Sequence, residues 1–138
     1  MSSIFSFAQL SRYGFWVPTL LGCIFFYLFA GYKILDPQNI YWLHNIDPQQ
    51  HYLGWAFFRF GSWHWPLGLN PNYGLAISSS IVYTDSIPLF ALIFKVGNSL
   101  MPTVFQYFGW WTLCCFIGQS IAAWLLLGIF IRNDLIKM

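Results

Sequence analysis

Between two apolar segments, residues 45–55 read NIDPQQHYLGW. Asp47 followed by Pro48 indicates a helix start, because an aspartate side chain can cap unpaired backbone N–H groups and proline suits the first helical position. Gln50 lies three residues after the expected cap, where its amide can reach back to the capping residue. The sequence therefore predicts a short helix over about residues 48–60.

The polar side chains of this helix are confined to one narrow stripe. At about 100° per residue, Gln50, His51 and Gly54 fall together on an otherwise apolar, aromatic-rich surface. A short aromatic helix with one polar edge is typical of the boundary between membrane and water. We therefore expect Asp47 to be a carboxylate at a membrane surface.

The composition is that of an integral membrane protein. Of the 138 residues, 7% are charged and 58% are hydrophobic, whereas about 25% charged residues are usual for a soluble domain. The net charge of +2 is small and comes from scattered basic residues, so nucleic acid is not an expected partner. Membrane lipid is an expected partner because the chain is so apolar. Cys23, Cys114 and Cys115 lie in apolar segments, which indicates buried thiols and no disulfide framework.

The apolar segments predict an all-α membrane protein with about three transmembrane helices and a single membrane domain over residues 1–138. Residues 14–35 and 105–131 are each long enough to cross about 30 Å of hydrocarbon. Residues 86–101 are shorter and predict a thin or re-entrant helix, with Asp85 or Ser86 as its cap. The loop between them, residues 36–85, is rich in Trp and Tyr and carries the short interfacial helix.

This layout resembles the N-terminal part of the GT-C type membrane glycosyltransferases, most closely an uncharacterised bacterial branch. The residues that carry the resemblance are Asp47–Trp55, Pro66–Gly74, Ser79–Pro88 and Phe105–Gly109. Such enzymes transfer a sugar from a polyprenyl-phosphate donor to an extracytoplasmic acceptor, and they contain many more transmembrane helices. The resemblance thus implies a truncated, N-terminal fragment that is inactive alone. It also implies a multi-pass protein of the bacterial inner membrane, with a cytoplasmic N-terminus and an external loop 36–85.

In such enzymes the first external loop supplies an acidic residue to the active site, as a general base or as a metal ligand, and Asp47 matches that position. A helix start stabilises the ionised form of Asp47, which suits a metal ligand at least as well as a base. Helix capping is the alternative role. Asp47 and His51 form an incomplete donor set for a divalent metal ion, so the cofactor stays an open question.

Several other polar residues are candidates. Asp85 is a second catalytic candidate, with capping as its alternative. Gln50, His51 and Arg59 are candidate substrate-binding residues, and Arg59 is expected either to pair with a phosphate or to make a structural pair. Lys95, if it lies within a span, should face protein or water.

Two function classes follow from the sequence. The concentration of Asp, His and Asn in one loop favours the N-terminal part of a polyprenyl-phosphate-dependent glycosyltransferase. The alternative is a small, non-catalytic integral membrane protein that binds lipid or a partner subunit.

Overall fold

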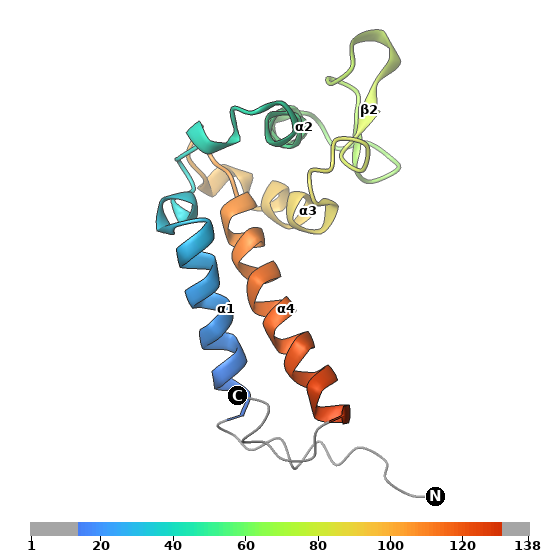
Figure 1. Ribbon diagram of the computed structural model, residues 1–138. Coiled ribbons are helices and arrows are strands. Elements are labelled where there is room, and N and C mark those ends of the chain that lie inside the picture. The colour runs from blue at the N-terminus through green and yellow to red at the C-terminus, as the bar shows by residue number, and fades with distance from the viewer. Residues whose placement is uncertain (1–13, 131–138) are drawn as a thin grey trace, which may run out of the picture. The chain divides into compact units, whose positions relative to one another are not determined.

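The computed structural model describes residues 14–130. The chain is mostly helical, which confirms the helical fold class in its coarse form, and it also contains a small sheet. It divides into two compact units (Figure 1). Unit 1 combines the chain up to Leu35 with the chain from Phe108 onward, and unit 2 is Asp36–Tyr107.

Unit 1 is an antiparallel pair of helices, α1 (Trp16–Phe29) and α4 (Phe108–Phe130), with a 3₁₀ turn, η2 (Tyr32–Leu35), after α1 (Figure 1). The helices approach closely at Gly22, where an added Cβ would lie 2.7 Å from Ile117 Cα. Such small residues let helix backbones pack tightly in apolar surroundings. Phe26 packs edge-on against Phe116, with ring centroids 5.9 Å apart.

The start of α4 is fixed to the turn η2. Trp110 Nε1 donates a hydrogen bond to Leu35 O at 3.0 Å, and Gly109 lies so close to Ile34 O that any Cβ there would collide with it. A backbone carbonyl cannot move aside as a flexible side chain can. This position of α4 therefore requires glycine.

The expectation of three transmembrane helices is not supported. Within residues 14–130, one helix is long and apolar enough to cross a membrane by length and composition, over Phe108–Gly128, with mean hydropathy 1.6. The helix α1 is apolar but has 14 residues. In the segment 86–101, the helix α3 (Pro88–Val96) has nine residues, which is about 14 Å and far short of the hydrocarbon thickness.

Unit 2 contains the expected helix after the polar stretch. This helix, α2, spans Ile46–Phe60 and follows a 3₁₀ turn, η3 (Tyr41–Leu43). Beyond α2, the strands β1 (Leu69–Asn70) and β2 (Ser79–Ser80) pair antiparallel, with Leu69 opposite Ser80 and Asn70 opposite Ser79. A 3₁₀ turn, η4 (Leu75–Ile77), lies between the strands, and another, η5 (Asn98–Leu100), follows α3.

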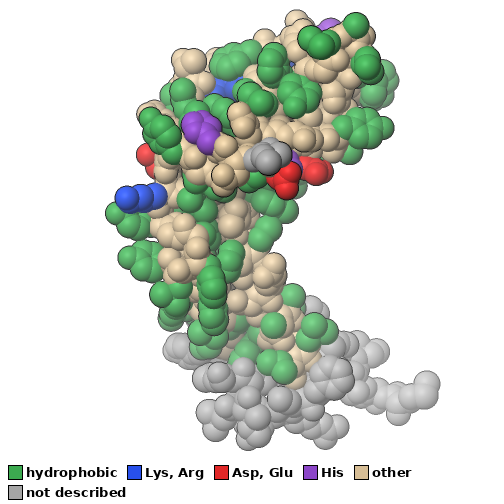
Figure 2. Space-filling view, turned by 45° about the horizontal axis from the view of Figure 1, so that its top comes forward, with side chains coloured by type: hydrophobic (Ala, Val, Ile, Leu, Met, Phe, Trp, Pro, Cys, Tyr) green, Lys and Arg blue, Asp and Glu red, His purple; other side chains and the backbone are tan. Residues whose placement is uncertain are grey.

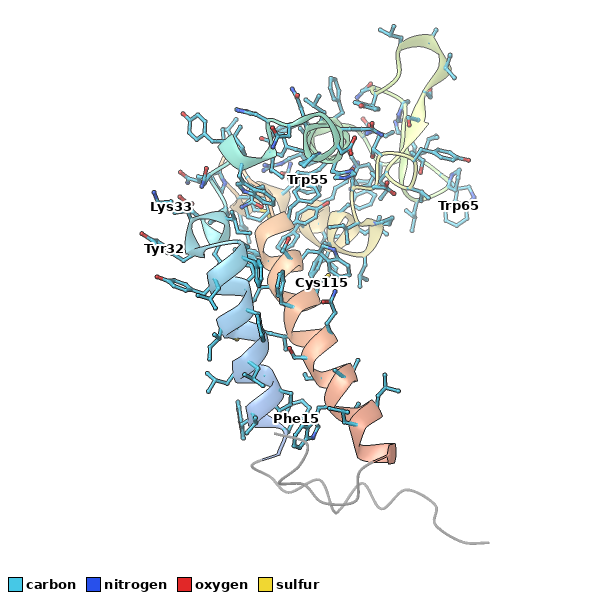
Figure 3. The ribbon with its side chains drawn as sticks, viewed as in Figure 1. Phe15, Tyr32, Lys33, Trp55, Trp65 and Cys115 are labelled. Carbon is cyan, nitrogen blue, oxygen red and sulfur yellow. The ribbon has the colours of Figure 1, made fainter. Side chains whose placement is uncertain are left out.

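The core of unit 2 is aromatic and centres on Trp55 of α2. Trp55 is fully buried, lies inside the unit (Figure 3), and donates from Nε1 to Phe105 O at 3.0 Å. Its ring meets that of Tyr107 at 5.0 Å between centroids, and Phe94 of α3 stacks on Tyr107 at 5.2 Å. Burial of these large rings is the main stabilising contribution in the unit.

The two ends of unit 2 are joined by one buried residue, Gln106. Its backbone N–H donates to Pro37 O at 2.7 Å, and its side-chain Nε2 donates to Asp36 O at 2.8 Å. These bonds satisfy a buried amide that would otherwise be costly. They also close residues 36–107 into a self-contained unit.

Candidate functional site

The candidate site begins at the first turn of α2, where the structure corrects the expected helix start. The N-cap is Asn45, without a side-chain capping bond, and the first helical hydrogen bond runs from Gln49 N to Asn45 O at 2.9 Å. Asp47 therefore lies inside the first turn and is not the cap. Its side chain is exposed.

The polar stripe of α2 contacts a turn that lies about 33 residues further along the chain. His51 Nδ1 lies 2.9 Å from Thr84 O, and Gln50 Nε2 donates to Tyr83 O at 3.5 Å. Ser86 Oγ donates in return to His51 O at 3.0 Å. The predicted grouping of Gln50 and His51 on one face of the helix is confirmed. This face contacts residues 83–86, whereas a face directed to solvent was expected.

These contacts fix the chemical state of His51. A carbonyl oxygen only accepts hydrogen bonds, so Nδ1 must carry the proton in the contact with Thr84 O. In the neutral ring, Nε2 is then the nitrogen with the basic lone pair. The contact with Thr84 O thus orients the His51 ring.

Glycine at position 54 allows the turn to lie directly on the helix. Gly54 is buried, and an added Cβ would lie 2.6 Å from Ser86 Oγ and closer still to the side chain of Thr84. The carbonyl of Gly54 accepts a bond from Asn70 Nδ2 at 2.9 Å. The third member of the stripe is therefore where both the turn and the strand β1 meet α2.

Residues 83–87, which we call the acidic turn, are held by buried polar groups. The hydroxyls of Thr84 and Ser86 lie 2.7 Å apart, and the Tyr107 hydroxyl donates to Ser86 O. Asp85 and Ile87 have positive φ angles of 47° and 51°. Such a conformation is unusual for a branched residue and is kept where surrounding contacts enforce it.

The expected capping role of Asp85 or Ser86 is wrong. The helix α3 begins at Pro88 and its N-cap is Ile87, without a side-chain capping bond. The Ser86 hydroxyl instead contacts α2 through His51 O. Asp85 is exposed in the acidic turn, so its carboxylate is available for another role.

Two exposed carboxylates belong to the segments that meet at His51. Asp47 lies one helical turn before His51, and Asp85 directly follows Thr84, whose carbonyl holds the His51 ring. The space-filling view shows acidic side chains gathered beside a histidine on one face (Figure 2). The hydrogen bonds of His51 and Gln50 to Thr84 and Tyr83 bring α2 next to the turn that carries Asp85.

The metal hypothesis for Asp47 depends on how many metal-ligating side chains lie together. Within the described residues, no group of three or more His, Cys, Asp or Glu side chains could hold a metal ion. A closed zinc site, which needs three or four protein ligands, is thus not formed there. Mg²⁺ needs fewer protein ligands, because it binds through one or two carboxylates together with waters and phosphate oxygens.

The Arg59 side chain is directed to the segment after α3 and not to Asp47 or Asp85. Arg59 lies eight residues after His51, and its side chain is 4% exposed. The guanidinium donates to Asn98 Oδ1 at 2.8 Å, Pro102 O at 3.0 Å and Thr103 O at 3.3 Å. Burial lowers the Arg59 pKa. Of the two expected roles, these contacts match the structural one, because Arg59 ties the segment after α3 to the end of α2.

Lys95 of α3 is also buried, at 5% exposed. Its Nζ donates to Ser62 O at 3.1 Å and lies 3.8 Å from the centre of the Phe58 ring and 4.7 Å from that of Trp63. Burial lowers the Lys95 pKa, while the ring faces offset part of the lost hydration. The side chain faces protein, as expected for a cation in an apolar setting.

Sequence reasoning missed the buried polar residues that support the candidate site. Thr84, Ser86 and Asn70 are buried and hydrogen-bonded, and Tyr107 donates to the acidic turn from the other end of unit 2. The run from Ser78 to Ser86 is rich in hydroxyl residues, which was the available signal. Hydroxyl residues are common in loops, however, so their burial could not be read from the sequence.

Comparison with known proteins gives one informative match. The model of a family described as "Domain of unknown function (DUF6311)" matches residues 19–138. No curated protein matches the chain, and no solved structure does.

Proposed function

The chain belongs to the DUF6311 family, and we propose that its unit 2 contributes catalytic residues to a membrane glycosyltransferase. The reaction is transfer of a sugar from a polyprenyl-phosphate donor to an extracytoplasmic acceptor. One observation carries the proposal: Asp47 and Asp85 are exposed, and the ring of His51, one helical turn after Asp47, is fixed at 2.9 Å by the carbonyl oxygen of Thr84, the residue before Asp85.

The chemistry assigns a role to each of these residues. Asp47 accepts the proton of the acceptor hydroxyl as its oxygen attacks the anomeric carbon of the sugar. The new C–O bond forms as the bond from that carbon to the phosphate oxygen breaks, and the polyprenyl phosphate leaves with its electron pair. The His51 side chain and the Gln50 amide position hydroxyl groups of the sugar, and Asp85 accepts hydrogen bonds from other sugar hydroxyls of the donor.

A divalent cation is compatible with this arrangement. If one is used, Asp47 and Asp85 would hold it together with donor phosphate oxygens, and the ion would supply charge neutralisation at the leaving phosphate. Asp47 lies in the first turn of α2 and is exposed, so a cation held there would be reached from solvent.

The proposed location follows from α4 and from the distribution of charge. In this proposal α4 crosses the bacterial inner membrane, residues 36–85 face the non-cytoplasmic side, and the N-terminus is cytoplasmic. Arg59 is the one basic residue among Lys and Arg in residues 36–85. Loops poor in Lys and Arg are typical of the non-cytoplasmic side.

A second function is favoured by the surface of α4. Only 6% of its apolar window is buried inside the structure, so lipid or other helices must cover the rest in a membrane. This observation supports the alternative of a non-catalytic membrane protein that binds lipid or a partner subunit.

The substitution Asp47→Asn separates the two functions. Asparagine has nearly the shape of aspartate but cannot accept the proton or bind a cation strongly, so transfer should fall by about a hundredfold or more. The assay follows loss of a radiolabelled polyprenyl-phosphate sugar in membranes that contain the protein. Asp36→Asn is the matched control, because Asp36 is an exposed aspartate of unit 2 whose Oδ1 accepts a bond from Gln38 N, and asparagine retains that acceptor.

Two results would reject the catalytic proposal. One is transfer by Asp47→Asn at the wild-type rate, with equal protein level. The other is absence of donor consumption by a full-length relative that carries the same residues, in membranes from cells that make it. Either result would leave lipid or partner binding as the function.

A further inference from the structure

The hairpin between β1 and β2 ends in an apolar tip, which we define as Gly74–Ser78. The tip contains the 3₁₀ turn η4, Leu75–Ile77. Leu75 is 94% exposed and Ile77 is 91% exposed. Two large aliphatic side chains at the end of one projecting loop form an unusual surface for a group that stays in water.

The base of this hairpin is fixed, whereas its tip projects from the body of unit 2 (Figure 1). Asn70 is 1% exposed and binds Gly54 O of α2. Ile81, also 1% exposed, binds Gly68 O through its N–H at 3.0 Å. The exposed tip is therefore held out by a buried base.

The backbone of the tip is strained where it displays these side chains. Leu75 and Ser78 have positive φ angles of 55° and 62°, whereas Gly74, at 95°, adopts such an angle without strain. Leucine rarely adopts this conformation, and such strain tends to be kept at functional sites. The tip thus combines a strained backbone with exposed apolar side chains. Contact with an apolar surface would remove the apolar side chains from water and so offset the free energy of both the strain and the exposure.

The surroundings of the tip identify the apolar surface as lipid. Residues 60–84 contain no Asp, Glu, Lys or Arg, so no charge must be dehydrated when this segment enters a bilayer. The same segment displays Trp65, 84% exposed and directed away from the core, and Tyr83, 80% exposed (Figure 3). Trp and Tyr are enriched at membrane–water interfaces. A protein partner would more often be met by a surface that also offers polar or charged contacts.

We propose that the tip inserts into the apolar layer of a phospholipid membrane and anchors this edge of unit 2 there. Leu75 and Ile77 enter the hydrocarbon, and the exposed aromatic rings of the same uncharged segment lie toward the headgroups. The inference does not rest on glycosyl transfer, because it uses neither Asp47 nor Asp85.

A fluorescent probe at the tip tests the proposal. In the full chain, with its three cysteines replaced by alanine, Ile77→Cys carries an environment-sensitive nitrobenzoxadiazole label, and the protein is reconstituted in phosphatidylcholine vesicles. We expect emission at shorter wavelength, quenching by lipids with spin labels on their acyl chains, and loss of quenching by aqueous iodide. The matched control is Gln38→Cys, an exposed position of unit 2 outside the uncharged segment, which should stay accessible to iodide.

A second variant tests whether the apolar character of the tip drives insertion. Leu75→Asp places a charge at a fully exposed position, so folding of unit 2 is expected to be unaffected, whereas insertion is opposed by the cost of a charge in hydrocarbon. The Ile77 probe should then regain iodide quenching. The proposal is overturned if the Ile77 probe behaves like the Gln38 probe. It is also overturned if the Ile77 probe resists both iodide and spin-labelled lipid, because protein then covers the tip.

Discussion

Replacing Gly54 by alanine should separate the acidic turn from α2. In α2 an added Cβ would lie 2.6 Å from Ser86 Oγ and closer to Thr84, and both side chains are buried. The hydroxyls of Thr84 and Ser86 bond to each other, and Ser86 also bonds to His51 O. Neither hydroxyl can move away from the new methyl group without breaking one of these bonds.

The expected loss of stability follows from three contributions. Alanine is favoured over glycine inside a helix by about 1 kcal/mol. Overpacking of a close contact costs about 1–3 kcal/mol, and each of the two disturbed hydrogen bonds contributes about 1 kcal/mol. The net effect of Gly54→Ala is thus a decrease of about 2–4 kcal/mol in the free energy of unfolding.

Urea denaturation in detergent micelles, followed by tryptophan fluorescence, measures this change. The matched control is Gly118→Ala in α4, where nothing lies within 4 Å of an added Cβ. That variant should be neutral or more stable by up to about 1 kcal/mol. If Gly54→Ala unfolds at the same urea concentration as Gly118→Ala, the close contact between α2 and the acidic turn does not exist in solution.

Two further predictions concern the buried cations. Arg59→Lys should lower the urea midpoint, since an ammonium group cannot bond at once to Asn98 Oδ1, Pro102 O and Thr103 O as the guanidinium does; an unchanged midpoint would show that these bonds contribute nothing net. Because burial lowers the Lys95 pKa in the folded state, the folded protein binds fewer protons than the unfolded one between the lowered and the usual lysine pKa. Stability should therefore rise with pH across that interval, and the rise should be smaller in Lys95→Met when urea midpoints are compared at several pH values.

The helix α2 and its polar stripe could be predicted because both depend on local sequence. A period of about 100° per residue places Gln50, His51 and Gly54 on one face whatever lies opposite, and the contacts with the acidic turn confirm that grouping. The partner of the stripe could not be predicted. It is formed by Thr84 and Ser86, more than 30 residues away, and a single sequence carries no record of such pairing.

The predicted starts of the two helices were wrong for a different reason. The pair Asp47–Pro48 fits a helix start, but proline is tolerated throughout the first turn because the N–H groups of that turn have no intrahelical partner. The pair is therefore equally compatible with a cap at Asn45, which the structure has. Near α3, the positive φ angles of Asp85 and Ile87 delay the helix start to Pro88, and the long-range bond from Tyr107 to Ser86 O that fixes this turn has no local signal.

The predicted count of three membrane spans is not supported, because apolar composition does not reveal where a helix ends. Residues 86–101 are largely apolar, yet α3 stops at Val96 and a 3₁₀ turn follows Gly97. The apolar side chains of α3 are used within unit 2, where Phe94 packs on Tyr107 and Phe105. An apolar segment can thus serve an aromatic core as well as a bilayer, and sequence hydropathy does not distinguish the two.

The arrangement of charge along α2 connects the fold to the proposed chemistry. Arg59 and Lys95 gather near the C-terminal end of α2, where the acceptors they contact are carbonyl and amide oxygens. That end of a helix carries partial negative charge, which stabilises cations without a carboxylate. Asp47 lies at the opposite end of the helix, in its first turn. Because the buried cations are satisfied by backbone, amide and ring groups, the fold does not require Asp47 or Asp85 as ion-pair partners for them. Both carboxylates are left exposed, as the proposed role of a general base for an external hydroxyl requires.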